Sequence, residues 1–174
     1  IGDVCGNPML AHKATADARQ AVAAVLAESV EPTTTRAASR TGTTGNPCIP
    51  NVIFTDPEIA WAGLTETTAK REGIDYQIAI YPWAASGRAQ AIGRSAGRTK
   101  WLIEPDTQRV LGCGIVGPGA GELISAAVTA IDQQWTAHQL TASIAPHPTL
   151  SETLSGAAEV FLGEAIEIYK PKRT

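Results

Sequence analysis

The sequence TKWLIEPDTQRVLGCGIV, residues 99–116, determines the predicted fold. We interpret its two apolar segments, 99–103 and 110–116, as β-strands. The segment that joins them, 104–107, contains a proline and an aspartate, and both residue types suit a turn. Strands joined by so short a connection pair antiparallel. This stretch therefore predicts an antiparallel sheet.

Further elements are predicted on either side of these two strands. Strands are expected at 52–55 and 76–80, and a helix at 65–72, capped by Thr65 and ended by Gly73. In the 76–80 strand, Tyr76, Ile78 and Ile80 alternate with polar or small residues, which indicates that these three face the core. Helices at 122–134, 136–140 and 149–162 complete an α+β layer.

An amphipathic helix is also predicted near the N-terminus, over residues 8–27. Asn7 suits the capping position, and Pro8 suits the first helical position. The unpaired N–H groups at this end could bind an electron-rich ligand edge. Apolar residues recur at helical spacing at Leu10, Ala14, Ala18, Ala21, Val22, Val25 and Leu26.

Composition excludes several classes of function. The 174-residue chain carries a net charge of −3, which gives no electrostatic basis for binding nucleic acid or a membrane surface. Neither a membrane-spanning run nor a signal peptide is visible, so we expect a cytoplasmic location. The three cysteines are far apart and lack zinc-ligand spacing, so no metal site is predicted. The basic residues at 170–173 are interpreted as a solvated terminus.

The sequence PHPTLSE, residues 146–152, allows two interpretations. In the first, Thr149 and Glu152 form a T-x-x-E capping box at a helix start, which needs no function. In the second, Glu152 accepts a hydrogen bond from one ring nitrogen of His147 and leaves the other nitrogen free to exchange a proton with a substrate. Spacing alone favours the capping box.

The glycine-rich segment 117–121 is not predicted to bind phosphate. A nucleotide-binding G-x-G-x-x-G turn that began at Gly117 would require glycine at position 122, where the sequence has Glu122. A carboxylate would repel a pyrophosphate, whereas it is favourable at a helix N-terminus that binds no anion.

Several motifs together resemble the flavoprotein disulfide reductase family. HPTLSE, residues 147–152, is similar to the family's active-site base motif, and IGD (1–3) with MLAH (9–12) resembles the end of its FAD site. YPWAASGRA (81–89) and residues 112–122 resemble its interface domain. The resemblance implies three parts: an FAD-domain remnant at 1–30, a linker at 31–50 with an insertion at 32–45, and a dimerisation domain at 51–174.

The resemblance also implies a function. The family passes electrons between a dithiol, a cysteine pair, FAD and NAD, and acts as a homodimer in which His147 would be the base and Glu152 its orienter. Asp3 would hold the ribityl chain of FAD, and the segment of Met9, Leu10, Ala11 and His12 would meet the flavin. From the residues alone, Asp3 is preferably interpreted as a turn residue, and His12 as a surface or packing histidine.

Within the family, Leu150 and residues 82–88 favour the lipoamide-oxidising members, whose partners are the lipoyl domains of a 2-oxoacid dehydrogenase complex. A C-x-x-x-x-C pair is absent, and the NAD site is expected to lie outside this chain. We therefore expect an inactive fragment of a larger enzyme. The alternatives are a dimerisation module without catalysis and a fragment of a related reductase of the glutathione or mercuric type.

Overall fold

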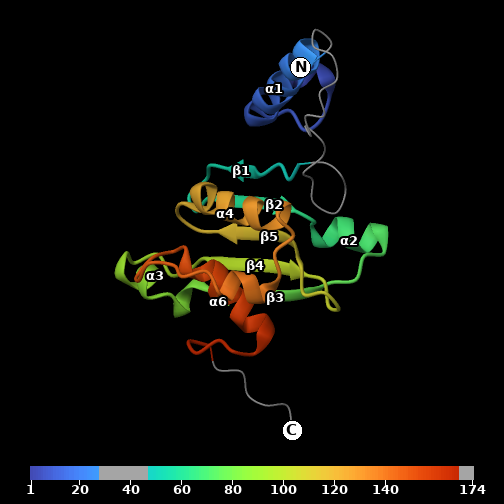
Figure 1. Ribbon diagram of the computed structural model, residues 1–174. Helices are drawn as coiled ribbons and strands as arrows, with labels where there is room; N and C mark the ends of the chain where they lie inside the picture. Colours follow the sequence, from blue (N-terminus) through green and yellow to red (C-terminus); the bar gives the residue numbers. More distant parts are fainter. Residues whose placement is uncertain (28–46, 169–174) are drawn as a thin grey trace. The chain divides into compact units, whose positions relative to one another are not determined.

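The computed structural model describes residues 1–27 and 47–168 (Figure 1). The chain divides into two compact units, Ile1–Ser39 and Arg40–Thr174, and each is described by itself. The predicted insertion at 32–45 and the basic segment at 170–173 lie outside the described residues. Within the part of the chain that is described, no helix is both long and apolar enough to cross a membrane.

The first unit contains a short 3-10 helix, η1 (Gly2–Cys5), and the predicted long helix, α1 (Ala11–Ala27). The predicted start of α1 was wrong by three residues. The Asn7–Pro8 peptide is cis, and the first helical bond runs from the Ala14 N–H to the Leu10 carbonyl at 3.0 Å. Leu10, and not Asn7, therefore occupies the capping position. The apolar residues Val22, Val25 and Leu26 on this helix are each more than half exposed.

The second unit is built on a five-stranded antiparallel sheet with the strand order β1-β2-β5-β4-β3 (Figure 1). Its strands are β1 (Asn51–Ile53), β2 (Ile59–Gly63), β3 (Gln77–Pro82), β4 (Arg98–Ile103) and β5 (Val110–Val116). The antiparallel pairing of β4 with β5 is confirmed. Strand β2 was not predicted, because alanine and glycine dominate its five residues and its pairing with β1 and β5 is a tertiary property.

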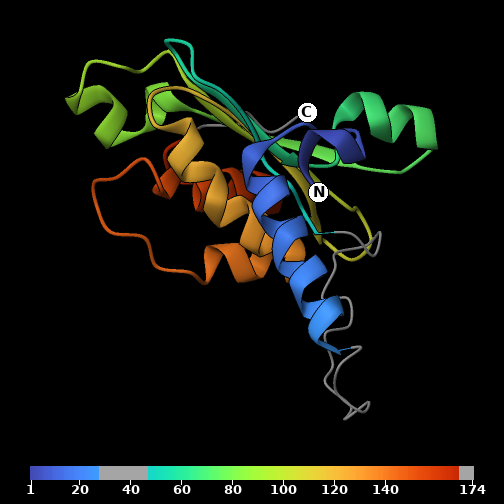
Figure 2. The ribbon, with the colours of Figure 1, turned by 90° about the horizontal axis from the view of Figure 1, so that it is seen from above.

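Helices cover one face of this sheet (Figures 1 and 2). Helix α4 (Ala120–Asp132) packs on β2 and β5, while α6 (Glu152–Leu162) packs on β3, β4 and the short α5 (Ala137–Thr141). Helix α2 (Glu66–Glu72) has the predicted Thr65 cap and ends at Gly73 in a left-handed conformation. After β3 come η2 (Trp83–Ala85) and α3 (Gly87–Ala91). The predicted α+β class is confirmed.

The predicted inner face of β3 was wrong. Ala79 and Tyr81 are buried, at 1% and 4% exposed, whereas Ile78 and Ile80 are 45% and 40% exposed. Ala79 lies opposite Trp101 on β4, and Tyr81 lies opposite Thr99, so both are on the face that α6 covers. The alternation predicted a strand correctly. Which set of residues faces the helices depends on the register between strands.

The N-terminus of α4 binds a carboxylate of the chain itself. The Gly121 N–H donates to Glu58 Oε2 at 2.8 Å. Glu58 lies in the connection from β1 to β2. This contact gives a second reason not to assign phosphate binding to residues 117–121. Another segment, 112–117, does have G-x-G-x-x-G spacing, but it runs along β5, where Gly112 pairs with both Gly63 and Leu102. It is therefore not a strand-to-helix turn.

Close approach of α6 to β3 requires glycine at position 156. A Cβ added there would lie 2.6 Å from both Cδ2 and Cε2 of Tyr81. We therefore expect Gly156→Ala to lower the free energy of unfolding by about 1–3 kcal/mol, as overpacking of a core does. In an unobstructed helix the same change would be stabilising by about 1 kcal/mol. Urea unfolding measures which effect wins.

The matched control for this change is Gly114→Ala on β5. A Cβ at position 114 would meet only the flexible Lys100 Cε, at 3.8 Å. This control should leave the free energy of unfolding nearly unchanged. A Gly156→Ala protein as stable as the wild type would contradict the close packing of α6 on Tyr81.

Candidate functional site

The candidate site lies in the loop between α5 and α6, where the structure places His147 beside Glu152. The Nδ1 atom of His147 is 2.8 Å from Glu152 Oε1. The imidazole side chain is 77% exposed, whereas that of Glu152 is 32% exposed. The His147–Pro148 peptide is cis. Because the ring is so exposed, its contact with Glu152 is the main interaction that orients it.

Glu152 also makes one of the two contacts that the capping-box interpretation requires. Its second oxygen, Oε2, accepts a hydrogen bond from the Thr149 N–H at 2.7 Å. The two oxygens of one carboxylate thus serve two partners, and the contact with His147 does not compete with the backbone contact. The bridging carboxylate therefore links the imidazole of His147 to the backbone of Thr149.

The capping box itself is incomplete, and the predicted start of this helix was wrong. The Thr149 hydroxyl donates to the Pro146 carbonyl at 2.7 Å instead of accepting from the backbone of Glu152. Helix α6 begins at Glu152, three residues later than predicted, after Ser151, which makes no side-chain cap. The hydroxyl closes the turn that contains His147, so the segment 146–151 forms a loop before the helix.

Electrostatics determine which ring nitrogen carries the proton. Partial burial raises the pKa of the Glu152 carboxyl, but the hydrogen bonds from Thr149 and His147 outweigh it and leave the pKa below its usual value. An ionised carboxylate can only accept hydrogen bonds, so Nδ1 of His147 must be the donor. In the neutral ring, Nε2 then has a free lone pair. This is the arrangement required of a proton acceptor.

His147 and Glu152 line a cavity of about 460 Å³ together with Tyr81, Ser86, Glu159 and Glu167. Burial, followed by the nearby carboxylates, raises the pKa of Tyr81 to about 12, so its hydroxyl stays protonated. Burial, together with Glu167 and Glu164, raises the pKa of Glu159. His147 keeps a lone pair on Nε2, because its Nδ1 donates to Glu152. Among the described lining residues, His147 is therefore the best suited to exchange protons.

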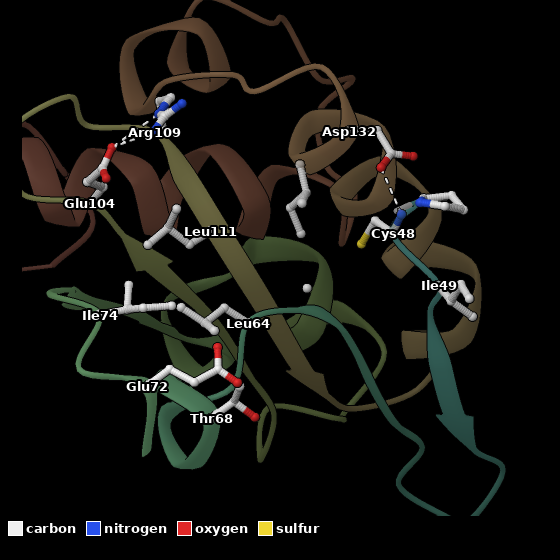
Figure 3. Close-up of a pocket in the computed structure, with 13 residues that line it drawn as sticks. Cys48, Ile49, Leu64, Thr68, Glu72, Ile74, Glu104, Arg109, Leu111 and Asp132 are labelled. Atoms are coloured by element: carbon white, nitrogen blue, oxygen red, sulfur yellow. Dashed lines mark hydrogen bonds and ion pairs between the residues drawn. The ribbon is translucent and has the colours of Figure 1, made fainter. Parts of the chain in front are cut away.

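A larger cavity, of about 570 Å³, lies elsewhere in the same unit (Figure 3). Its charged groups are already paired: Arg109 with Glu104 at 2.9 Å, and the Cys48 N–H with Asp132 Oδ1 at 2.9 Å. Burial, followed by Asp132, raises the pKa of the Cys48 thiol to about 11, which makes the thiol a poor nucleophile. This second cavity is not the candidate site.

The residues predicted to bind flavin all belong to the first unit. Asp3 lies in η1, and its carbonyl accepts from the Gly6 N–H at 3.0 Å. Met9 and Leu10 precede α1, whose first residues are Ala11 and His12. The five residues thus surround the N-terminal end of one helix, and their role in flavin binding stays a prediction. No group of three or more potential metal ligands is found among the described residues.

Several residues of the candidate site were not predicted from the sequence. Tyr81, Ser86 and Gly87 line the cavity, yet they were noted only within the stretch 81–89. A Cβ added to Gly87 would lie 3.9 Å from Cε1 of His147, which places the start of α3 beside the imidazole. Glu159 and Glu167 carry no local signal, because only the fold places them in the lining of the same cavity as His147.

Comparison with known proteins extends these observations. Residues 49–158 match the family model of the pyridine nucleotide-disulphide oxidoreductase dimerisation domain. Dihydrolipoyl dehydrogenase of Buchnera aphidicola is 40% identical over an aligned length of 176 residues, and the match covers 100% of this chain and 34% of that protein. The chain thus spans about a third of the length of this relative.

Solved structures show the same relationship. LpdA from Mycobacterium tuberculosis superposes with a TM-score of 0.76 at 28% identity, over 91% of this chain and 32% of that one. The HOCl-induced flavoprotein disulfide reductase RclA from Escherichia coli, in a Cu(II) complex, gives a TM-score of 0.74 at 26% identity, over 93% and 34%. The described fold is therefore that of the matched family.

The lowered pKa of Glu152 predicts that stability depends on pH. A carboxyl whose pKa is lower in the folded state stabilises the fold above its unfolded pKa of about 4.3. That contribution is lost as the pH falls through the folded pKa. The stability difference between wild type and Glu152→Gln, measured by urea unfolding, should be present near neutrality and disappear as the pH falls below the folded pKa of Glu152. It should not exceed about 1 kcal/mol, since exposed pairs contribute little.

Glu122→Gln is the matched control, because Glu122 lies in the first turn of α4 and is exposed. This variant reports how much a carboxylate in the first turn of a helix contributes to the free energy of unfolding when it has no imidazole partner. If Glu122→Gln shows the same pH dependence as Glu152→Gln, the contact with His147 does not determine the titration of Glu152.

Proposed function

Because the chain belongs to the pyridine nucleotide-disulphide oxidoreductase family through its dimerisation domain, we propose that His147 is the base of a dithiol-oxidising flavoenzyme. Glu152 is the carboxylate that orients this base. The observation that carries the proposal is the bridging position of Glu152, 2.8 Å from Nδ1 of an imidazole that is largely exposed and lines a cavity.

The proposed chemistry is removal of a proton from a substrate thiol. A thiolate attacks a disulfide, whereas a thiol does not, so a base beside the substrate accelerates the exchange. Nε2 of His147 accepts the proton, and the ring becomes an imidazolium. The Glu152 carboxylate stabilises that positive charge through Nδ1 and holds the ring in one tautomer. The disulfide under attack belongs to a cysteine pair outside this chain.

The intact enzyme is, in this proposal, a dihydrolipoamide dehydrogenase that oxidises dihydrolipoamide with NAD as acceptor. The sequence similarity to dihydrolipoyl dehydrogenase of Buchnera aphidicola supports this substrate. FAD would bind at a site to which this chain contributes Asp3 and the segment from Met9 to His12. The NAD site and the cysteine pair would lie in the other two thirds of the protein, so the 174 residues alone should be inactive.

The proposal includes a homodimer formed through residues 51–174. The match to a dimerisation domain supports association, and the exposure of His147 suits a base that serves the redox centre of the partner subunit. The lipoyl domains of a 2-oxoacid dehydrogenase complex are the proposed physiological partners. Similarity to RclA keeps a different disulfide substrate as the second candidate.

Replacement of His147 by glutamine in the intact enzyme tests the role of the base. We expect turnover of dihydrolipoamide to fall by about 10²–10⁴-fold, the usual contribution of a general base. Flavin content and dimerisation should be unchanged, because the side chain is mostly exposed. His138→Gln is the matched control, since His138 is an exposed histidine on neighbouring α5 and should retain turnover. Wild-type turnover by His147→Gln would remove the assignment.

The size of the native polypeptide tests whether a larger enzyme exists. An antibody raised against residues 51–174 should detect a band about three times the length of this chain, since the chain covers 34% of its relative. The purified protein should show the yellow absorbance of bound flavin. A native band of 174 residues without flavin would instead identify a dimerisation module without catalysis.

A further inference from the structure

We infer that Thr153 is a positioning residue for the His147–Glu152 pair, held in place by Thr99 and Trp83. This inference rests on the proposed role of His147 as a base. It concerns residues that the proposed chemistry does not touch. The three residues form one buried hydrogen-bonded chain from the end of β3, through β4, to the first turn of α6.

The chain of hydrogen bonds has one possible direction. The Thr153 hydroxyl donates to the Leu150 carbonyl at 2.7 Å, because a carbonyl can only accept. Its single proton is then used, so Thr99 must donate to Thr153 across their 2.7 Å contact. Trp83 Nε1 in turn donates to the Thr99 oxygen at 3.0 Å. Each proton has one acceptor, and the chain ends on the backbone of the PHPTLSE stretch.

Burial makes this arrangement costly to break. Trp83, Thr99 and Thr153 are each 0% exposed, so water cannot replace a lost partner. Loss of the Thr153 hydroxyl would leave the buried Thr99 hydroxyl without an acceptor. The ring of Trp83 is itself tightly enclosed, because a Cβ added to Gly117 would lie 2.1 Å from its Cζ3. The donor at the start of the chain therefore cannot easily move.

The chain of hydrogen bonds ends next to the two residues that hold the imidazole in place. Glu152 immediately precedes Thr153, and Thr149, the backbone partner of Glu152, immediately precedes Leu150. A second buried tryptophan acts one residue further along α6, because Trp101 Nε1 donates to the Leu154 carbonyl at 3.0 Å. The imidazole is 77% exposed, so its position depends on Glu152 and on the loop backbone. The sheet core thus sets where the carboxylate meets the imidazole.

The experiment compares Thr153→Val, which keeps the shape and removes the hydroxyl, with Thr153→Ser, which keeps the hydroxyl. The chain has three histidines, so the ring nitrogens of His147 can be resolved by ¹⁵N NMR in the 174-residue protein. In the wild type, the neutral ring should be the Nδ1–H tautomer. In Thr153→Val we expect a shift toward Nε2–H, the form favoured by a freely hydrated imidazole, and Thr153→Ser should restore the wild-type spectrum.

Two further variants complete the design. Thr129→Val is the matched control, because Thr129 also donates to a carbonyl of its own helix, that of Ser125, but is exposed. It should leave the His147 spectrum unchanged. Thr99→Val breaks the same chain one bond further from the site and should shift the tautomer in the same direction. It also supplies the test if Thr153→Val does not fold.

The outcomes separate this inference from the proposed function. A wild-type tautomer in a folded Thr153→Val or Thr99→Val protein overturns the positioning role. If the tautomer shifts, turnover of the intact Thr153→Val enzyme should fall about 10- to 100-fold, as misplacement of a catalytic group does. A shifted tautomer with unchanged turnover would leave the positioning role intact and overturn the assignment of His147 as the base.

Discussion

The contact between α6 and strands β3 and β4 is the constraint on which the candidate site depends. Glycine at position 156 lets the helix approach Tyr81, and two buried tryptophan N–H groups secure its first turn through Thr153 and the Leu154 carbonyl. That turn begins with Glu152. A carboxylate that orients an exposed imidazole must itself be held rigidly. Here Glu152 is held rigidly because α6 is fixed to the sheet core.

The site therefore combines an exposed reactive group with a buried support. His147 lies on a loop whose turn is closed by local hydrogen bonds, and its ring is open to a partner. Trp83, Thr99 and Thr153 form a fully satisfied hydrogen-bonded chain that is buried in the second unit. Buried polar chains of this kind stabilise a structure only when every member is paired, and they then specify one geometry. The second cavity lacks this combination, since Arg109 pairs with Glu104 and Asp132 accepts from the Cys48 N–H.

Exposed apolar residues occur on both described units. Ile78 and Ile80 on β3 are each at least 40% exposed, and Val22, Val25 and Leu26 on α1 are more exposed still. The family model named for dimerisation covers residues 49–158, which include Ile78 and Ile80 but not the three residues of α1.

Sequence by itself determined the features that depend on neighbours a few residues apart. Thr65 and Gly73 bound α2 as predicted, and the hairpin of β4 and β5 follows from its short connection. The spacing of His147 and Glu152 gave their contact as one of two interpretations, and the structure contains that contact. Such features are predictable because caps, turns and short contacts act within one or two turns of chain.

Tertiary structure alone decided the rest. Register between strands placed Ala79 and Tyr81 inside and the isoleucines outside, and it paired β2 with β5 across fifty residues of sequence. The hydrogen-bonded chain from Trp83 through Thr99 to Thr153 joins residues that no local pattern connects. The same holds for the cavity that Glu159 and Glu167 line together with His147. The physical reason is that packing and buried hydrogen bonds depend on which elements meet, and that is a property of the whole fold.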